Sequence, residues 1–535
     1  MEARTGHMKT FASIPQWRCI SYSMLLVAAV GASAGVFSSS RAVIQNGFTI
    51  SSNAPNKIAP WVMEHTANGE NAECFIVVAD QADLSQSSSK ATREGKGRYV
   101  YDSLLNKSRV TQKPILTWLR ERGLEHRSFY VVNAILVKGN REIVEALAAR
   151  SDVARIEGNP LVPNRLPRPV ATVNALQPHV PQNIEPGIAY THAPEVWRLG
   201  FTGQGIVVGS LDSGVRWTHN ALKPHYRGWD GTTADHDYNW HDAIHDSPGN
   251  PCGTDSPEPC DDEGHGSHTT GTMIGDDAAG NQIGMAPGAQ WIACRGLDGH
   301  LETTSPAMLL ECMEFFLAPY PVGGTPTQGD PAKAPDVTNN SWGCPPELGC
   351  SVETLQSAVE ALAAAGIMMV ASAGNDGPRC SSIDDPPGIY EAAYTVGALV
   401  INTDTIADFS GRGPVVIDAS NRLKPDITAP GVDIRSASNT SDTAYESEEG
   451  TSQAAPHVAG AIALLWSAKP ALRRDLERSR NTLNYRAFHI SDGMCNDGLA
   501  VTPNNIYGYG RVDILTAVRP IPRARPTPYP RPTSP

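Results

Sequence analysis

Four short segments of the sequence carry residue types that together could support nucleophilic catalysis. The first is an apolar run at residues 206–211, bounded by Gly205 and ending in Asp212. A buried parallel strand has this continuous apolar character, and open α/β sheets place their sites at the carboxyl ends of such strands. Asp212 is therefore a candidate acid, although Asp-Ser-Gly after a strand is more often only a turn.

The second segment, DDEGHGSHTTGT, places His265 and His268 at the glycine-rich opening of a predicted helix. Histidine is the side chain that gives and takes protons near neutral pH, so His265 is the candidate general base. Two histidines three residues apart could instead bind a metal. The segment lacks the glutamate of the H-E-x-x-H zinc sequence, which weakens that alternative.

The third and fourth segments offer a hydrogen-bond donor and a nucleophile. IMMVASAGNDG is a strand-like run that contains Asn375 near its end, and a rigidly held amide can donate to a developing oxyanion. The same residues also fit an ordinary turn. In EGTSQAAPHVAG, Ser452 stands just before a predicted helix, near backbone N–H groups and the positive end of the helix dipole. A serine in this place is more often only a helix cap.

Taken together, the segments supply an acid, a base, an oxyanion donor and a nucleophile, with the chain order Asp, His, Ser that subtilisin has and chymotrypsin lacks. VVGSLDSGV, GHGSHTTGT, ASAGNDGP and GTSQAAPHVAG, with FSGRGP and KPDITAPGV, resemble the signature blocks of subtilisin-like serine proteases over residues 190–517. DHDYNWHDAI, GDDAAGNQIGMAPGA and TNNSWG are most similar to the bacillopeptidase F-like branch of that family.

The resemblance implies a fold and a role for each matching residue. The fold is α/β, a subtilisin-like parallel-sheet catalytic domain with helices on both faces, expected over residues 189–518. Ser452 would be the nucleophile, His265 the general base and then acid, and Asp212 the carboxylate that orients it. Asn375 would be the oxyanion donor.

The resemblance also implies where substrate binds. Ser341, Trp342 and Gly343 match the segment that pairs with the extended substrate backbone. The sequence departs from the family at Ser267, where threonine is usual, and at residues 453–455, where Met-Ala-Ser is usual. These replacements are small, so they bear on substrate detail rather than on catalysis.

Residues 71–163 predict a small α+β domain ahead of the catalytic one. Its strands and helices are expected at residues 75–78, 114–120, 130–137, 141–149 and 153–156. This order fits a split βαβ unit, the ferredoxin-like arrangement. The stretch IVEALAARSDVARIEGNP resembles the inhibitory propeptide of subtilisin-like proteases. The resemblance implies a precursor with its own intramolecular inhibitor, and an unrelated α/β interaction domain is the alternative.

The other segments flank these two domains. Lys9 and Arg18 precede a short apolar stretch with Ala-Ser-Ala at residues 32–34, so residues 1–34 are interpreted as a signal peptide. A membrane anchor is the alternative, but a spanning helix needs about 20 apolar residues. The remaining parts are a spacer, a proline-rich processing linker and a proline- and arginine-rich tail, at residues 35–70, 164–188 and 519–535.

The composition fits export and argues against a nucleic-acid partner. The net charge is -13 and the pI is near 5.6, whereas nucleic-acid binders usually carry a basic face. Of ten cysteines, all but Cys19 and Cys74 lie in the predicted catalytic domain, an even number as disulfide pairing requires. The segments 252–260 and 344–350 are the shortest loops to close, while the full connectivity stays open. A zinc site is the alternative for these cysteines, but no second C-x-x-C or histidine-rich partner accompanies them in the sequence.

No cofactor is required for the predicted chemistry, and metal ligands are unknown. Structural calcium is common in the resembled family, which leaves calcium an open option here. Residues 276–284 resemble a calcium-binding loop region without an unmistakable ligand set. Asp384 and Asp385 fit solvated acids equally well.

The sequence thus predicts a secreted serine endopeptidase that hydrolyses peptide bonds in proteins and processes itself from a precursor. Its partners would be protein and peptide substrates and its own propeptide, without nucleic acid or a stable membrane span. A monomer is expected, outside the cell, with cell-surface association left open. The acidic residues 261–263 precede His265, which predicts negative potential for a basic side chain just upstream of the scissile bond; a solvated acidic loop is the alternative.

Two alternatives would need different residues. A pseudo-protease that only binds peptides would be expected to lack Ser452, His265 or Asp212, and all three are present. A sedolisin-type acid peptidase would need glutamate in place of the base, where this chain has His265.

Overall fold

The computed structural model describes residues 57–164, 166, 184–473 and 475–520 of the 535-residue chain. The predicted signal peptide, most of the predicted spacer and processing linker, and the tail from residue 521 onward lie outside these residues. Within the described ranges, no helix is both long enough and apolar enough to cross a membrane.

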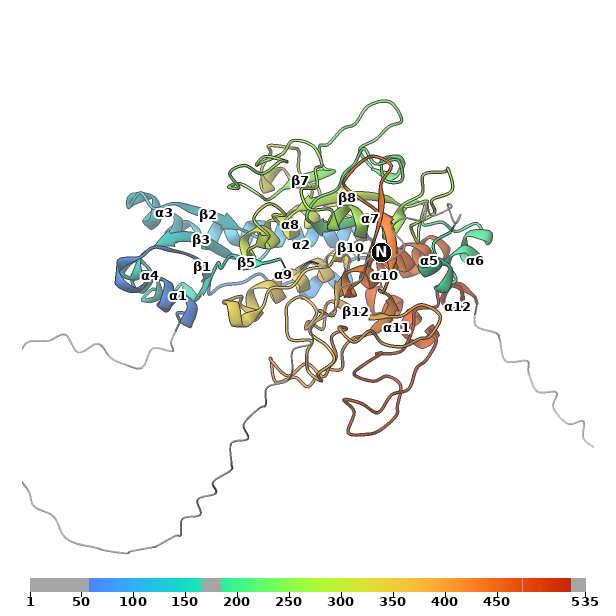
Figure 1. The fold of residues 1–535 in the computed structure, drawn as a ribbon. Helices are drawn as coiled ribbons and strands as arrows, with labels where there is room; N and C mark the ends of the chain where they lie inside the picture. Colours follow the sequence, from blue (N-terminus) through green and yellow to red (C-terminus); the bar gives the residue numbers. More distant parts are fainter. Residues whose placement is uncertain (1–56, 165, 167–183, 474, 521–535) are drawn as a thin grey trace, which may run out of the picture. The chain divides into compact units, whose positions relative to one another are not determined.

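The large domain, residues 184–520, is built on a seven-stranded sheet (Figure 1). In spatial order the strands are β13 (Ile427–Pro430), β12 (Tyr394–Leu399), β11 (Met368–Ser372), β10 (Val337–Asn340), β6 (Val207–Asp212), β8 (Gln290–Arg295) and β7 (Trp240–Asp242). Every neighbouring pair is parallel. The carboxyl ends of all seven strands therefore share one edge of the sheet.

Helices cover both faces of this sheet. They are α7 (His265–Ile274) and α10 (Thr451–Ala468) on one face, and α8 (Pro306–Leu317) and α9 (Val352–Ala364) on the other. In β8, Trp291 and Ala293 pack in the core that contains α7 and α10, whereas Ile292 and Cys294 pack with α8 and α9. Because strand side chains alternate between faces, a strand buried on both sides is apolar throughout. The predicted α/β fold with helices on both faces is confirmed.

Shorter elements and disulfide bonds complete the large domain. The elements are α5 (Pro186–Tyr190), α6 (Ala193–Arg198), α11 (Leu476–Arg486), α12 (Ile514–Val518) and the antiparallel pair β14 (Ile434–Ala437) and β15 (Tyr445–Glu448). The disulfide bonds are Cys252–Cys260, Cys294–Cys312, Cys344–Cys350 and Cys380–Cys495. They include both short loops that the sequence singled out. Each bond restricts the unfolded chain and so stabilises the folded domain.

A four-stranded antiparallel sheet forms the small domain, residues 57–164, drawn in blue to cyan in Figure 1. Its strands are, in spatial order, β2 (His126–Phe129), β3 (Ala134–Gly139), β1 (Ala72–Val78) and β4 (Val153–Gly158). Its longer helices are α2 (Arg93–Thr111), α3 (Lys113–Glu121) and α4 (Arg141–Ala148). This is the ferredoxin-like arrangement that the sequence predicted.

Two elements of the small domain differ from the sequence prediction. Helix α2 was not predicted, because most of its residues are polar and its buried positions include Gly97 and Ser108. The apolar run at 130–137 is not one strand, since β2 ends at Phe129 and β3 begins only at Ala134. Between them, residues 130–132 are apolar because they are buried in the hydrophobic cluster that contains α8 and α9 of the large domain. Helix α1 (Pro60–His65) lies within the predicted spacer, and its Val62 is fully buried.

The small domain also supplies hydrogen bonds to the first turns of α8 and α9. Asn159 Oδ1 accepts from the backbone N–H of Ala307, near the start of α8, at 2.9 Å. Glu157 Oε1 accepts from Ser351 Oγ, the residue that caps α9, at 2.7 Å. The first N–H groups of a helix have no partner within the helix, and they favour negative charge. The small domain thus stabilises the two helices on one face of the large sheet.

Candidate active site

The order of strands in the large sheet brings three of the predicted site residues to one edge. Asp212 is the last residue of β6, Ser341 follows β10 directly, and Asn375 lies three residues beyond the end of β11. Strand β10 pairs with both β6 and β11, with Asn340 opposite Leu211 on one side and Ala371 on the other. Residues from distant parts of the sequence therefore meet at the carboxyl edge.

Asp212 and His265 form a buried hydrogen-bonded pair. His265 is the first residue of α7, and its Nδ1 lies 2.7 Å from Asp212 Oδ1. Both side chains have an exposed fraction of 0%. Asp212 also accepts hydrogen bonds from the backbone N–H of Ser213 at Oδ1 and from Thr269 Oγ1 at Oδ2. With its carboxylate held from several sides, Asp212 fixes the orientation of the imidazole ring and leaves Nε2 of His265 facing away from the pair.

The charge around His265 favours its protonated form. Burial alone lowers the pKa of His265, but the Asp212 carboxylate, with Glu448 and Glu263, outweighs it and raises the pKa above the ordinary 6.5. Within the described residues, His265 Nε2 has no hydrogen-bond partner. The ring therefore combines a strengthened affinity for a proton with an available nitrogen, as a general base requires.

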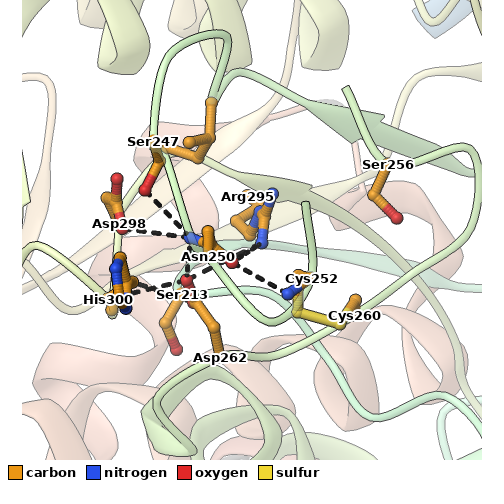
Figure 2. Close-up of polar contacts among 12 residues, drawn as sticks. Ser213, Ser247, Asn250, Cys252, Ser256, Cys260, Asp262, Arg295, Asp298 and His300 are labelled. Carbon is orange, nitrogen blue, oxygen red and sulfur yellow. Dashed lines mark hydrogen bonds and ion pairs between the residues drawn. A yellow bond between two sulfur atoms is a disulfide. The ribbon is translucent and has the colours of Figure 1, made fainter. Parts of the chain in front are cut away.

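A buried network of hydrogen bonds and ion pairs, drawn in Figure 2, stabilises the loop that precedes His265. Asn250 donates from Nδ2 to Asp262 at 2.5 Å and to Asp298 at 3.2 Å. Its Oδ1 accepts from the backbone N–H of Cys252 at 2.8 Å, beside the Cys252–Cys260 disulfide bond. Arg295, at the end of β8, lies 3.7 Å from Asp262. The network joins the loop to the sheet edge that carries Asp212.

The acidic residues 261–263, predicted to face substrate, have mostly structural contacts. Asp261 accepts from Ser213 Oγ at 2.9 Å and from Ser267 Oγ at 2.6 Å, which connects the end of β6 to the first turn of α7. Asp262 belongs to the network with Asn250. Only Glu263 is exposed, and it accepts from the backbone N–H of His265 at 2.8 Å. Asp261 and Asp262 therefore position His265 rather than face solvent.

Ser452 is the second residue of α10, so it lies inside the helix and not just before it, as the sequence suggested. Its Oγ donates to the backbone carbonyl of Ser341 at 3.4 Å, and Ser341 Oγ donates to the backbone carbonyl of Ser452 at 3.0 Å. No hydrogen bond joins Ser452 Oγ to His265 within the described residues. Helices α7 and α10 nevertheless pack against each other, which keeps the two residues on the same face of the sheet.

Gln453 explains one departure from the family pattern. Its Nε2 donates to Glu448 Oε2 at 2.5 Å. Glu448 is buried, and burial raises its pKa to about 8, although the nearby His265 opposes this. Glu448 was not among the predicted residues, because a glutamate in the charged stretch YESEEG looks like a solvated residue. The only sequence signal was the polar Gln453 in place of an apolar residue.

Asn375 is oriented by Thr451, the residue before Ser452. Its Oδ1 accepts from both the backbone N–H and Oγ1 of Thr451, each at 2.9 Å. The preceding Gly374 has a φ of +82°, a conformation that favours glycine and turns the chain after β11. Because Oδ1 of Asn375 accepts these hydrogen bonds from Thr451, the Nδ2 donor group of Asn375 points away from Thr451. Asn375 and Ser452 both line one cavity.

That cavity has a volume of about 210 Å³. Its lining includes the predicted substrate segment, the predicted nucleophile and the predicted oxyanion donor: Ser341, Trp342, Gly343, Ser452 and Asn375. Asp212 and His265, which are fully buried, do not line it. The structure therefore brings the seven predicted residues into two adjoining groups.

The last residues of the small domain also reach this cavity. Val162–Pro163 forms β5, which pairs antiparallel with β9 (Thr303–Thr304) of the large domain. The backbone N–H of Asn164 donates to the carbonyl of Glu302 at 2.7 Å. Pro163, Asn164 and Leu166 line the cavity together with Ser452. An extended segment of this chain thus lies beside the predicted nucleophile.

Metal binding has no visible site in the described part of the chain. No group of three or more His, Cys, Asp or Glu side chains there is arranged to hold an ion. His268 donates from Nε2 to the backbone carbonyl of Ile434 at 2.8 Å, and burial lowers the pKa of His268 to about 3. In the loop at 276–284, Asp277 accepts from the backbone N–H groups of Ala279 and Asn281. Structural calcium stays the open option that the resemblance to the family gave.

Comparison with known proteins assigns the large domain to one family. A model of the subtilase family matches residues 203–510. The chain is 32% identical over 533 residues to Bacillopeptidase F of Bacillus subtilis (strain 168), covering 93% of this chain but only 34% of that protein. It is 30% identical over 340 residues to Subtilisin BL of Lederbergia lenta, covering 63% of this chain and 100% of the relative. It is 28% identical to Serine protease AprX of Bacillus subtilis (strain 168) over 386 residues, 66% and 79% of the two chains.

Proposed function

Because this chain belongs to the subtilase family of serine-type endopeptidases, we propose that it is a secreted endopeptidase that hydrolyses protein substrates with Ser452, His265 and Asp212. One observation carries the proposal: the buried Asp212–His265 pair lies at the sheet edge where Ser452 and Asn375 line a common cavity. Nucleophile, base, orienting acid and oxyanion donor are the parts that acyl transfer needs.

The reaction begins when Ser452 Oγ bonds to the carbonyl carbon of the substrate and its proton passes to His265 Nε2. The carbonyl oxygen takes the electron pair, and Asn375 Nδ2 donates a hydrogen bond to this oxyanion. His265 then gives the proton to the departing amine as the C–N bond breaks, which leaves an acyl group on Ser452. A water molecule, deprotonated by His265, attacks the acyl carbon, and the proton returns to Ser452 Oγ. Asp212 keeps Nδ1 protonated and stabilises the imidazolium in each step.

The small domain would act as an inhibitory propeptide that the enzyme removes by itself. The antiparallel pairing of β5 with β9, and the position of Asn164 and Leu166 in the cavity lining, support this part of the proposal. The hydrogen bonds from Glu157 and Asn159 to the starts of α9 and α8 support a role in folding. The cleaved bond would lie in the predicted linker, most of which is outside the described residues.

Two features of the chain support the proposal that it is secreted. Residues 1–34 have the character of a signal peptide, and the large domain carries disulfide bonds, which persist in oxidising surroundings. A monomer stays our expectation. The alternative, a pseudo-protease that binds peptides without cleaving them, is not favoured, because none of the three proposed catalytic residues is replaced.

Cleavage of casein tests the proposal directly. We expect the purified mature protein to degrade casein, and a serine-directed reagent to abolish this activity by covalently modifying Ser452. A peptide map of the treated protein should show the label on Ser452 alone among the serines. Casein that stays intact, with no label on Ser452, would favour the pseudo-protease.

The pH dependence of activity follows from the charge around His265. The imidazole must be neutral to accept the serine proton, and its pKa is raised above 6.5, so the protonated, inactive form persists to higher pH. We therefore expect kcat/KM to fall on acidification with a midpoint above pH 6.5. Rates on a neutral peptide between about pH 4 and 11 would measure this midpoint. A maximum near pH 4 would be the behaviour of an acid peptidase and would contradict the mechanism.

A further inference from the structure

A guanidinium group lies beside the loop at residues 276–284, the segment that resembles a calcium-binding loop region. Arg435 of β14 donates from Nη1 to Glu185 Oε1 at 2.6 Å and from Nη2 to Asn281 Oδ1 at 2.8 Å. The same guanidinium lies over the ring of Tyr445 in β15, 4.3 Å from the ring centroid. One side chain therefore joins the start of α5, the loop and the β14–β15 pair.

The other side-chain oxygens at the centre of this loop accept hydrogen bonds from the protein itself. Asp277 Oδ1 accepts from the backbone N–H groups of Ala279 and Asn281, at 2.8 and 3.0 Å. Asp277 Oδ2 accepts from Asn281 Nδ2 at 2.6 Å and from Tyr445 Oη at 3.0 Å. Partial burial raises the pKa of Asp277, but these hydrogen bonds outweigh it and lower the pKa below its ordinary value. The carboxylate is thus held in its charged form by donors of the chain.

This arrangement does not suit a calcium ion. Calcium takes about six to eight oxygen ligands at about 2.3–2.6 Å. Oxygen atoms of Glu185, Asn281 and Asp277 already accept from N–H and O–H donors. A cation bound between Glu185 and Asn281 would also have to displace the Arg435 guanidinium and would be repelled by its charge.

The surroundings of Arg435 make its contacts effective. The side chains of Arg435 and Glu185 have exposed fractions of 16% and 12%, so solvent and salt screen their attraction only weakly. A guanidinium is planar and carries five donors, so it can serve two acceptors and stack on an aromatic ring at the same time. The backbone strengthens the same junction, because the N–H of Glu185 donates to the carbonyl of Gln282 at 3.0 Å.

We infer that Arg435 takes the place of a bound calcium ion in this part of the fold. Its guanidinium holds Glu185 and the loop at 276–284 against the β14–β15 pair, so the loop keeps its structure without calcium. The loop directly follows α7, the helix that begins at His265, and therefore secures the far end of that helix. None of these loop contacts involves the proposed catalytic residues, so the loop is held in this way whether or not the protein is a protease.

The test measures amide hydrogen exchange by mass spectrometry in peptides that cover residues 276–284. The full-length Ser452→Ala chain is used, so that the proposed nucleophile cannot cut the sample. We expect the same exchange rates in excess EDTA and in excess calcium chloride. Adding Arg435→Gln should make exchange in EDTA about 10- to 100-fold faster, because charge-assisted hydrogen bonds that close the loop are lost. Arg435→Lys keeps the charge but not the planar fork, and its rate should lie between the two.

A matched control removes an arginine that does not contact the loop. Arg478 is exposed and pairs with Asp475 at the start of its own helix, so Arg478→Gln should leave exchange at 276–284 unchanged. Faster exchange of the loop in EDTA than in calcium, in the chain that keeps Arg435, would overturn the inference. Unchanged exchange in Arg435→Gln would overturn it as well. The comparison of EDTA with calcium needs no variant at position 435 to fold.

Discussion

Replacing Ser452 by alanine is expected to give an uncleaved precursor without measurable activity. The hydroxyl of Ser452 is the only side-chain group in the proposed mechanism that bonds to the substrate carbon, so its removal should lower kcat by about 10⁶-fold. The small domain would then stay attached, because its removal uses the same nucleophile. Gel electrophoresis and intact-mass analysis of the protein from a protease-deficient host would measure both effects.

A control separates this result from misfolding. Ser491→Ala changes an exposed serine of the same domain and should process and cleave as the wild type does. The thermal unfolding temperature of Ser452→Ala precursor should be at least that of the wild-type mature enzyme, since the small domain remains bound to α8 and α9. If the Ser452→Ala protein is nevertheless trimmed between Arg155 and Ala189, self-processing is refuted.

Replacing Asn375 by alanine should slow both processing and substrate cleavage without abolishing either. The Nδ2 donor is proposed to act on the oxyanion, which forms only as the bond to Ser452 is made. Its loss should therefore lower kcat by roughly 10²- to 10³-fold and leave KM nearly unchanged. Pulse labelling would show slow appearance of the mature form, and steady-state kinetics on one peptide would separate kcat from KM.

Thr451 offers a graded comparison for this variant. In Thr451→Val the Oγ1 donor to Asn375 is lost, while the backbone N–H donor at 2.9 Å remains. The Asn375 amide should largely keep its orientation in this variant. The decrease in kcat should therefore be clearly smaller than in Asn375→Ala. Equal losses in the two variants, or a rise in KM alone, would mean that Asn375 shapes the binding cavity and does not stabilise the oxyanion.

The chemistry-bearing residues could be predicted from the sequence because they follow local patterns. The apolar run at 206–211 predicted a buried strand that ends in Asp212, and β6 ends at that residue. The small residues around Ser452 predicted a tightly packed helix, and α10 is buried along nearly its whole length. Hydrophobic runs of a few residues indicate buried strands and helices, so neither prediction required knowledge of contacts between distant segments of the chain.

Other properties depended on which distant segments pack together. The run at 130–137 is apolar partly because Tyr130 and Val131 are buried in the hydrophobic cluster that contains α8 of the large domain, which no strand pattern could reveal. Glu448 looked solvated in the sequence, yet burial beside His265 and His268 raises its pKa.

The surroundings of the acidic residues were also decided by the tertiary structure. Asp261 and Asp262 turn inward to hold the loop before His265, whereas Asp385, far along the chain, lies next to Gly343. The sequence alone determined which candidate catalytic side chains the chain carries and the order in which they occur. Only the tertiary structure decided which carboxylates are buried, paired or turned toward the cavity, because the field at a charged group depends on its neighbours in space and not on its neighbours in the chain.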